Sequence, residues 1–317
     1  MWDLLSLPKP DKIFPDMTRR TFSATVLGAA TALSQNRRPI RIGAPIFVKS
    51  DDPEILAREH RRLNYTAAQF PPFQDPDANL IAATRKAYAA SNVVIAEVGA
   101  WVNILHPDPA LRKKNLDYAI DRMRIADEVD ARCCVDTAGS FNTKSSADPR
   151  NVTKEYFDAT VENCRKIIDA VKPKRSKFTI EMMFANLPDG PDSYLELIKA
   201  VDRKEFGVHM DVCNVLNSPD KYYNSGKYID ELFKKLGPWV MSCHAKDLTI
   251  PGGRSLTFIE VVPGRGIVDY KSYLRNLSMV PREAPLMLEH FANDDEFQEG
   301  ANFIRRQGAE VGVSFVT

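Results

Sequence analysis

Long hydrophobic runs are missing from this sequence of 317 residues. No apolar segment reaches the roughly 18 residues that a transmembrane helix needs, so we expect no membrane span. An excess of charge of one sign is also lacking, because 43 Lys and Arg face 42 Asp and Glu, for a formal net charge of +1. This balance gives no electrostatic reason to expect nucleic acid or an anionic membrane as a partner.

Cysteine and histidine are scarce, with five residues of each. The cysteines show no C-x-x-C spacing, and four of them lie in apolar runs: Cys133, Cys134, Cys213 and Cys243. We therefore expect buried thiols and no disulfide framework. Heptads, internal repeats and low-complexity tracts are absent from the sequence as well. What remains is an ordinary globular composition, 44% hydrophobic and 27% charged, sufficient for one large α/β domain or two small ones.

The N-terminal region has the layout of an export signal. Arg19 and Arg20 form a twin arginine that precedes a mildly apolar stretch at 24–33. This order is typical of a twin-arginine signal, which predicts export to the periplasm, although an ordinary N-terminal helix remains the alternative. We therefore set residues 1–38 aside as a signal region, and Met17 is a candidate for the real start of translation. Without a working signal the protein would stay in the cytoplasm.

The rest of the chain alternates short apolar runs with helical patterns, which predicts a parallel α/β domain. Eight such units match the size of a (β/α)8 TIM barrel, and we expect a single barrel over residues 39–317. A doubly wound sheet is the rival, but a glycine-rich phosphate loop does not follow the first strand. The expected strands are 41–47, 66–70, 93–98, 132–136, 178–183, 206–211, 240–244 and 286–289. We expect irregular connections at 214–227 and 247–269.

The last four of these strands each end in an acid or an imidazole. The residues are Glu181, Asp211, His244 and Glu289, about one β/α unit apart along the chain. In a barrel the carboxyl ends of neighbouring strands lie about 4.8 Å apart, so the four side chains can converge. Three carboxylates and one imidazole suit a divalent cation such as Mn²⁺, Mg²⁺ or Co²⁺. Each residue alone could instead be a hydrogen-bonded residue of the barrel rim.

Residues 40–315 resemble the xylose-isomerase-like TIM-barrel superfamily, which includes sugar phosphate isomerases and epimerases. The motifs that carry this resemblance are Ile180-Glu181, His209-Met-Asp211, His244-Ala-Lys-Asp247, Pro263-Gly-Arg-Gly266 and Leu288-Glu-His290. The resemblance implies that Glu181, Asp211, His244 and Glu289 hold the metal, most simply manganese. It also implies that Glu181 and Glu289 are the acid/base pair, with the metal stabilising a developing enediolate as a Lewis acid.

The sequence departs from the epimerases at two points. Asn214 stands where the epimerases have a histidine that contacts the substrate, and Asn cannot carry a proton at neutral pH. The arginine expected after the seventh strand is not clearly placed, although Lys246, Arg254 or Arg265 could serve instead.

Further polar and aromatic residues near the strand ends are candidates for binding the substrate. They are His209, Asn214, Lys246, Glu97, Trp101 and His106. For His209 and Lys246 the alternatives are a buried hydrogen-bonded histidine and a structural ion pair. We expect His290 to face away from the metal by strand alternation, and His60 to lie at the surface.

Three functions follow from these observations. The first is a metal-dependent sugar isomerase or epimerase that removes a proton next to a carbonyl. The second is a metal-dependent lyase or hydratase on 3-keto-glycosides, which Asn214 and export favour. The third is a non-catalytic sugar-binding protein. An endonuclease of the same superfamily would need a histidine-richer metal cluster and a basic surface, so we expect a small sugar as the partner, with a homo-oligomer left open.

Overall fold

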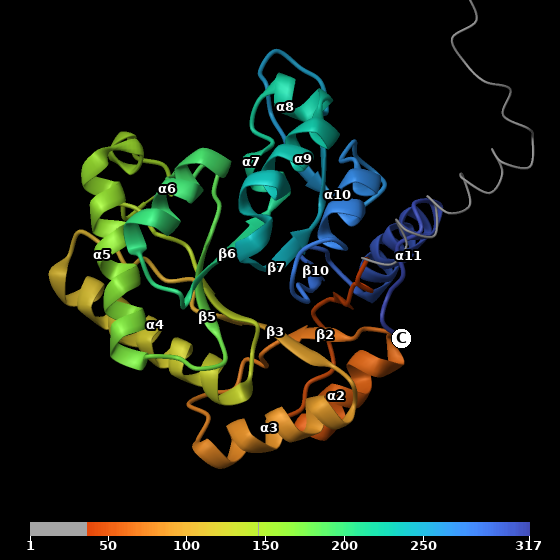
Figure 1. The fold of residues 1–317 in the computed structure, drawn as a ribbon, viewed down its shortest axis with the longest axis horizontal. Helices are drawn as coiled ribbons and strands as arrows, with labels where there is room; N and C mark the ends of the chain where they lie inside the picture. The colour runs from red at the N-terminus through yellow and green to blue at the C-terminus, as the bar shows by residue number, and fades with distance from the viewer. Residues whose placement is uncertain (1–36, 145) are drawn as a thin grey trace, which may run out of the picture. The chain divides into compact units, whose positions relative to one another are not determined.

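The computed structural model describes residues 37–144 and 146–317, which form a barrel of parallel strands surrounded by helices (Figure 1). The signal region predicted at residues 1–38 lies almost entirely outside the described residues. The strands close in the order β1-β10-β7-β6-β5-β4-β3-β2, so the expected (β/α)8 barrel is confirmed. No helix in the described ranges is long and apolar enough to cross a membrane.

The elements lie close to their expected positions. The barrel strands are β1 (Ile42–Gly43), β2 (Ala67–Gln69), β3 (Val94–Gly99), β4 (Cys133–Asp136), β5 (Lys177–Glu181), β6 (Phe206–Asp211), β7 (Val240–Ala245) and β10 (Leu286–Leu288). The helices are α2 (Pro53–Arg62), α3 (Ala78–Ala90), α4 (Pro109–Val129), α5 (Lys154–Val171), α6 (Pro191–Val201), α7 (Val212–Val215), α8 (Pro219–Tyr223), α9 (Ser225–Leu236), α10 (Tyr270–Leu277) and α11 (Asp294–Glu310). Two 3₁₀ turns, η1 (Pro149–Val152) and η2 (Gly237–Trp239), precede α5 and β7.

Aspartates fix where several helices begin. The side chain of Asp77 accepts a hydrogen bond from the backbone N–H of Leu80 at 2.8 Å, which satisfies a donor that the first turn of α3 leaves free. Asp52 caps α2 in the same way, and Asp108 caps α4. Proline follows Asp52 and Asp108 directly, at a helix position where its missing N–H costs nothing.

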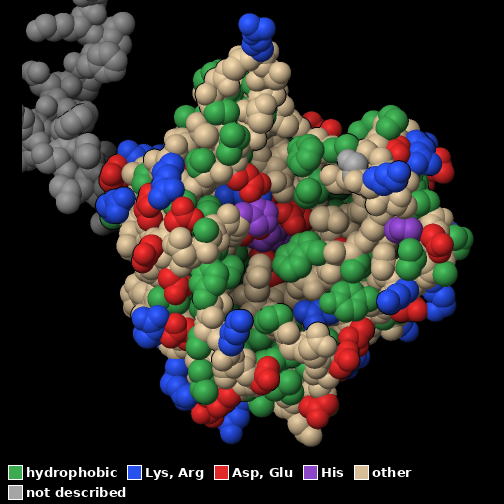
Figure 2. Space-filling model, turned by 180° about the vertical axis from the view of Figure 1, so that it is seen from behind, with side chains coloured by type: hydrophobic (Ala, Val, Ile, Leu, Met, Phe, Trp, Pro, Cys, Tyr) green, Lys and Arg blue, Asp and Glu red, His purple; other side chains and the backbone are tan. Residues whose placement is uncertain are grey.

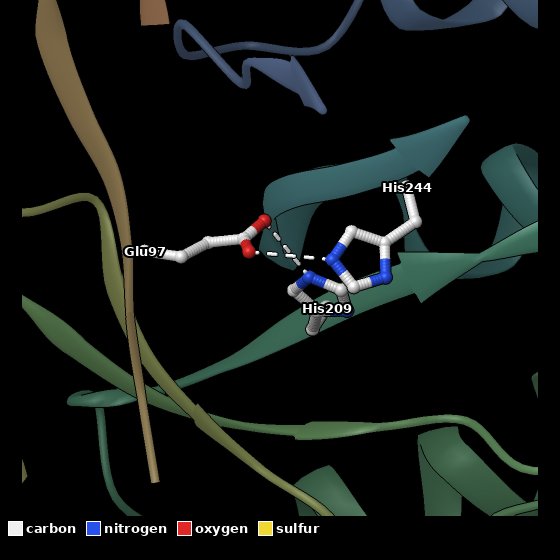
Figure 3. A group of neighbouring side chains, drawn as sticks. All are labelled: Glu97, His209 and His244. Carbon is white, nitrogen blue, oxygen red and sulfur yellow. Dashed lines mark hydrogen bonds and ion pairs between the residues drawn. The ribbon is translucent and has the colours of Figure 1, made fainter. Parts of the chain in front are cut away.

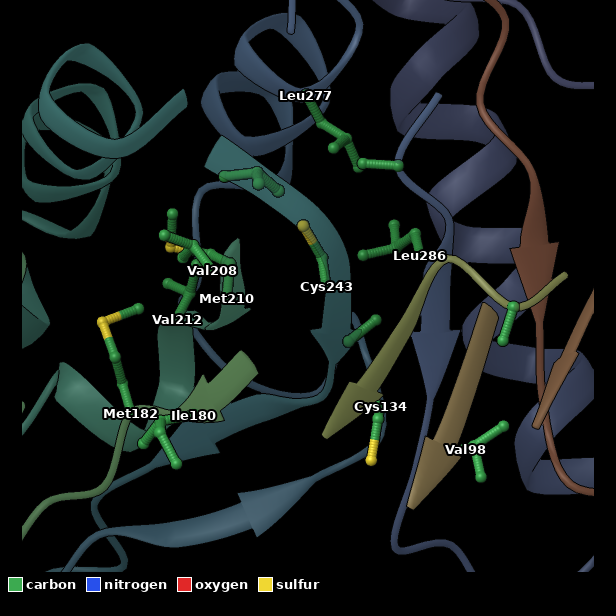
Figure 4. Close-up of a cluster of buried hydrophobic side chains, with 14 of the residues drawn as sticks. Val98, Cys134, Ile180, Met182, Val208, Met210, Val212, Cys243, Leu277 and Leu286 are labelled. Atoms are coloured by element: carbon green, nitrogen blue, oxygen red, sulfur yellow. The ribbon is translucent and has the colours of Figure 1, made fainter. Parts of the chain in front are cut away.

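Alternation along β5 and β6 separates apolar from polar side chains. Ile180, Val208 and Met210 belong to the main hydrophobic core, in which the strands pack against the helices (Figure 4). The intervening residues Glu181, His209 and Asp211 form part of a buried polar cluster instead. Because successive side chains of a strand point to opposite faces, the same pattern that builds the core also gathers the polar groups.

Three segments differ from expectation. Strand β1 is shorter than the predicted 41–47, because Pro45 has no N–H to donate to a neighbouring strand. The segment 214–227 is largely helical, and Ser218 caps α8 with a proline at its first position. The long connection after β7 contains an antiparallel hairpin of β8 (Asp247–Thr249) and β9 (Ile259–Val261), whose short strands bracket the turn residues at 251–253.

The prediction that His60 lies at the surface is wrong. His60 is buried on α2, its ring centroid lies 5.7 Å from that of Tyr88, and its Nδ1 has no hydrogen-bond partner among the described residues. Burial lowers the pKa of His60 to about 4, while the neighbouring Glu59 opposes this shift. The imidazole is therefore neutral in the folded protein at pH 7.

This burial predicts a pH-dependent loss of stability. The unfolded chain binds a proton at an ordinary histidine pKa near 6.5, whereas folded His60 binds it only near pH 4, so stability falls as the pH drops from about 6.5 to 4. The contribution of this one residue reaches about 3 kcal/mol at pH 4. Urea unfolding of wild type and His60→Gln at several pH values measures it. An equal pH slope in both proteins would contradict the prediction.

Candidate metal centre

Four side chains meet at the C-terminal ends of adjacent strands. Glu181 ends β5, Asp211 ends β6, His244 lies near the end of β7, and Glu289 directly follows β10. Their ligand atoms all lie within 4.8 Å of one another. His244 Nδ1 is 3.0 Å from Glu289 Oε2, 3.3 Å from Glu181 Oε1 and 3.7 Å from Asp211 Oδ2. We call these four residues the tetrad.

The tetrad fits a divalent cation. His244 Nδ1 and Asp211 Oδ2 are buried, and neither makes a hydrogen bond of good geometry among the described residues, although both lie within ion-pair distance of charged neighbours. Oxygen atoms from three carboxylates thus surround one imidazole nitrogen. A dication at this point would replace the imidazole proton as the shared partner of the carboxylates, and oxygen with imidazole ligands suits Mn²⁺, Mg²⁺ or Co²⁺.

Lys246 lies against the same carboxylates. Its Nζ is 2.5 Å from Glu289 Oε1 and 2.8 Å from Asp211 Oδ2. A third carboxylate, Glu260 on β9, has Oε1 at 3.1 Å from the same nitrogen. Burial opposes a charge on Lys246, but Asp211 and Glu289 outweigh it and raise its pKa. Three tetrad carboxylates, one ammonium and one dication would together carry no net charge, which removes most of the cost of burying them.

Neighbouring charges shift the pKa values of Asp211 and His244 strongly. Burial disfavours ionisation of Asp211, yet Lys246 and His244 hold its pKa well below the usual range. Burial also disfavours imidazolium at His244, but Glu97, Glu289 and Glu181 raise its pKa well above that of a free histidine. The protein therefore neutralises these acids with His244 and Lys246 when no other cation is present.

Glu97 of β3 lies on the other side of His244 (Figure 3). Its Oε2 is 3.3 Å from His244 Nε2, and its Oε1 is 3.0 Å from His209 Nε2 and also accepts a short hydrogen bond from the Ser242 hydroxyl. Burial would raise the pKa of Glu97, but His244 and His209 hold it well below the usual range. An ionised Glu97 is an acceptor only, so it keeps Nε2 of His244 protonated, and a cation held by the tetrad would replace the proton on Nδ1.

This placement changes the interpretation of two predicted substrate contacts. Glu97 and His209 have no exposed surface, so neither can reach a sugar from the barrel opening. The two histidine rings pack edge to face, with centroids 4.2 Å apart. Both residues therefore contact His244 in the barrel interior and hold its ring in place. Glu97, His209 and His244 could also hold a metal by their spacing alone, but the hydrogen bonds of Glu97 already satisfy this group.

Two of the predicted substrate-binding residues hold Glu181. Asn214 donates from Nδ2 to Glu181 Oε1 at 3.1 Å and to the Met182 carbonyl at 3.1 Å. Trp101 donates from its indole nitrogen to Glu181 Oε2 at 3.3 Å. Both carboxylate oxygens of Glu181 therefore have a neutral donor, which fixes the direction of the side chain.

Trp101 has an uncommon backbone conformation. Its φ of 41° is in the left-handed region, where a bulky residue is strained. Asp136 supports the turn, because its Oδ1 accepts from the Val102 N–H at 2.9 Å. Gly99 allows the turn, because a Cβ there would meet the Trp101 ring at 1.8 Å. The strained backbone of Trp101 is thus part of the turn that places its indole nitrogen next to Glu181.

The remaining predicted residues lie nearer the rim. His106 accepts a hydrogen bond at Nδ1 from the Asp108 N–H before α4, and in the described part of the chain it has no hydrogen bond or ion pair with the tetrad. His290 does not face away from the site as expected. Its φ of 64° breaks the strand alternation, and its two nitrogens lie 2.7 Å from Glu260 and 3.5 Å from Glu289.

Sequence reasoning missed Asp136, Ser242 and Glu260. Asp136 ends a buried strand as the tetrad acids do, so the same signal was available. It is buried with Oδ2 unpartnered among the described residues, and burial, reinforced by the charge of Glu181, raises its pKa well above the usual range. Glu260 lies within the long connection, where no periodic pattern marks it.

Figure 2 shows histidine and acidic side chains in a hollow of one face, with hydrophobic side chains beside them.

The family model described as xylose isomerase-like TIM barrel matches residues 57–307, and the chain belongs to this family. A curated relative, the probable endonuclease 4 of Persephonella marina, is 24% identical over 216 residues, which cover 65% of this chain and 66% of that protein. The chain thus spans slightly less than two thirds of that relative's length.

Two solved structures share the fold. D-psicose 3-epimerase from Clostridium cellulolyticum H10, determined with D-tagatose, has a TM-score of 0.61 at 14% identity and covers 84% of this chain and 99% of its own. A xylose isomerase-like TIM barrel protein from Mycobacterium smegmatis, in complex with magnesium, has a TM-score of 0.61 at 17% identity, covering 88% and 98%. One structure with this fold is thus named as an epimerase, and the curated relative is named as a probable endonuclease.

Proposed function

We propose that this protein is a metal-dependent sugar isomerase or epimerase that removes a proton from the carbon next to a carbonyl. The observation that supports it is the convergence of three carboxylates and one imidazole nitrogen at four adjacent strand ends. The tetrad would hold the cation, with Mn²⁺ as the first candidate and Mg²⁺ or Co²⁺ as alternatives. A bound cation would supply Lewis-acid stabilisation of the negative charge that develops on the substrate oxygens.

The exposure of the tetrad residues indicates which of them can act on a substrate. Glu181 and Glu289 each keep 7% of their surface exposed, whereas Asp211 and His244 keep 0% and 2%. The two glutamates are therefore the tetrad members that can reach a substrate, and we assign them as the acid/base pair. Asn214 and Trp101 orient Glu181, and Lys246 holds Glu289. Trp101 is 45% exposed and can contact a sugar, whereas Lys246 is 2% exposed and its ammonium lies among the carboxylates of Asp211, Glu260 and Glu289.

Deuterium exchange tests this function. The protein is loaded with Mn²⁺ and incubated in D₂O with a panel of ketoses and aldoses, and we expect one deuterium at the carbon next to the carbonyl. EDTA treatment should abolish the exchange, and Mn²⁺ should restore it. Sugar binding without exchange across the panel would support a non-catalytic sugar-binding protein and reject the proposal.

A lyase or hydratase on 3-keto-glycosides is the second candidate. It uses the same first step, since removal of the C2 proton beside a C3 ketone expels the C1 substituent. Asn214 favours it, because this side chain holds Glu181 and cannot itself carry a proton. Release of the aglycone from an oxidised but not from an unoxidised glycoside would identify this activity.

A nuclease assay is also needed, because the curated relative is named as a probable endonuclease. The formal net charge of +1 gives little attraction to a phosphate backbone, and His244 is the single histidine of the tetrad. We expect no cleavage of DNA that carries an abasic site, at metal concentrations that support deuterium exchange. Cleavage at such a site without sugar exchange would reject the sugar assignment.

Glu97→Gln should weaken metal binding by about 10- to 100-fold, because loss of the acceptor that orients a ligating histidine has effects of this size. The amide can present an N–H to His244 Nε2 and so favours the wrong tautomer. Mn²⁺ titration followed by electron paramagnetic resonance measures the affinity without turnover. Glu196→Gln, an exposed glutamate on α6, is the matched control. Equal affinities in both variants would show that Glu97 does not orient the site.

A further inference from the structure

A cavity of about 780 Å³ lies between the loops that follow β1, β2 and β3, and Trp101 is one of its lining residues. Aromatic side chains form much of its wall: Phe47, Phe70, Phe73, Tyr88, Trp101 and Tyr118. Three of them are exposed to an unusual degree, with Phe47 at 50% and Trp101 and Tyr118 at 45% each. We call this space the aromatic cavity. Its volume is that of a small-molecule site, and clustered exposed aromatic groups commonly mark a binding surface.

Trp101 connects the aromatic cavity to the tetrad. Its ring lines the cavity, while its indole nitrogen donates to Glu181 Oε2. The strained backbone at Trp101 and the close approach of its ring to Gly99 keep the indole in this place. A molecule held at Glu181 would therefore have the aromatic cavity as its immediate neighbour.

One polar group in the wall, the Arg122 guanidinium, is available to a ligand. The Arg122 side chain donates from Nε to the Gly99 carbonyl at 3.0 Å, and its guanidinium lies over the rings of Phe70 and Tyr118 at 5.4 Å and 6.0 Å. Within the described ranges it has no carboxylate at ion-pair distance, so donors remain for an oxygen acceptor. His60 also lines the cavity, but its Nδ1 is buried and is therefore not a partner for a ligand.

We propose that the aromatic cavity binds an aryl group carried by the sugar substrate, as in the aglycone of an aryl glycoside with phenolic oxygens. Flat rings stack on the aromatic wall, and the Arg122 guanidinium donates to the phenolic oxygens. A free monosaccharide would leave this space to water. The inference rests on the proposed removal of a proton next to a carbonyl in the sugar half of the molecule. Because a glycoside has a carbonyl only after oxidation, the inference favours a keto-glycoside, the substrate of the lyase or hydratase, over a free sugar.

Isothermal titration of the full chain tests the aryl site without turnover. The probes are the 4-nitrophenyl and methyl D-glucosides, in both anomers, and 4-nitrophenol alone. We expect the aryl glucosides to bind at least about 10-fold more tightly than the methyl glucosides, and 4-nitrophenol to bind with or without Mn²⁺. Equal affinities for the aryl and methyl compounds, or no binding of any aryl probe, would overturn the proposal.

A pair of variants locates the binding. Tyr118→Ala should weaken the aryl glucosides by about 5- to 10-fold and leave the methyl glucosides unchanged. Tyr223→Ala removes an aromatic ring that is 72% exposed outside the cavity and should change neither. Sedimentation velocity is run on the same samples. If Tyr118→Ala alters self-association and not aryl affinity, the surface is a contact between copies of the chain and the proposal is wrong.

The two proposals fail in different ways. Loss of deuterium exchange with a persisting aryl preference would reject the isomerase or lyase assignment but keep the aryl site. Deuterium exchange with equal affinity for aryl and methyl compounds would reject the aryl site alone.

Discussion

Replacing Glu181 by Gln is expected to lower the rate of solvent deuterium incorporation into the epimer whose proton Glu181 removes by on the order of 10³-fold, the contribution of a well-placed general base. Glutamine keeps the size of the side chain and an oxygen for the metal, but it cannot accept the proton. The hydrogen bonds from Asn214 and Trp101 hold the carboxylate in one direction, so the amide should occupy nearly the same place. Exchange is measured by mass spectrometry with saturating Mn²⁺. A lower rate then reports the loss of the general base and not a weaker affinity for the metal.

Glu289→Gln provides the counterpart. If the two glutamates act on opposite faces of the substrate, each variant should still exchange deuterium into one epimer while the two epimers no longer interconvert. Glu196→Gln should retain the full rate, because this side chain is exposed on α6. Full exchange and interconversion in Glu181→Gln at saturating metal would remove Glu181 from the chemistry.

Asp247→Ala is expected to destabilise the protein by about 3–5 kcal/mol, because it leaves several buried donors without an acceptor. The two carboxylate oxygens of Asp247 accept four backbone hydrogen bonds, from Leu248, Gly264, Gly266 and Val268. Three of these bonds tie the segment after β9 to the first residue of β8.

Urea denaturation measures this loss, and Asp51→Ala, at an exposed aspartate, serves as the control. The free energy of unfolding of Asp247→Asn should lie between those of Asp247→Ala and Asp51→Ala, since an amide keeps one oxygen acceptor. The hairpin also carries Glu260, whose Oε1 lies 3.1 Å from Lys246, so partial unfolding of this segment should weaken metal binding as well. A stability within about 1 kcal/mol of the control would show that water replaces the lost acceptor.

The tetrad illustrates what a sequence can predict. Each of its members ends an apolar run or directly follows it, and four parallel strands of one barrel must finish at one end. The chain order of the strands therefore sufficed to bring Glu181, Asp211, His244 and Glu289 together. Asp136 carried the same signal at the end of β4, but it stands outside the tetrad and supports the turn at Val102.

Other contacts had no local signal. Glu97 and His209 are 112 positions apart, and their 3.0 Å contact depends on the curvature that brings β3 and β6 across the barrel from each other. His60 follows an amphipathic helical pattern that allows either burial or exposure, and the packing of Tyr88 against it decided the outcome. The backbone of Trp101 could not be predicted, because the turn depends on Asp136 and Gly99 together.

By itself the sequence determined the barrel, the order of its strands and the four side chains at their ends, because hydrophobic periodicity and strand direction are properties of local segments. The tertiary structure alone decided which groups surround those four: Glu97 beneath His244, Glu260 against Lys246, and Trp101 between Glu181 and the aromatic cavity. These neighbours come from distant segments, and barrel closure with its strand register sets their distances.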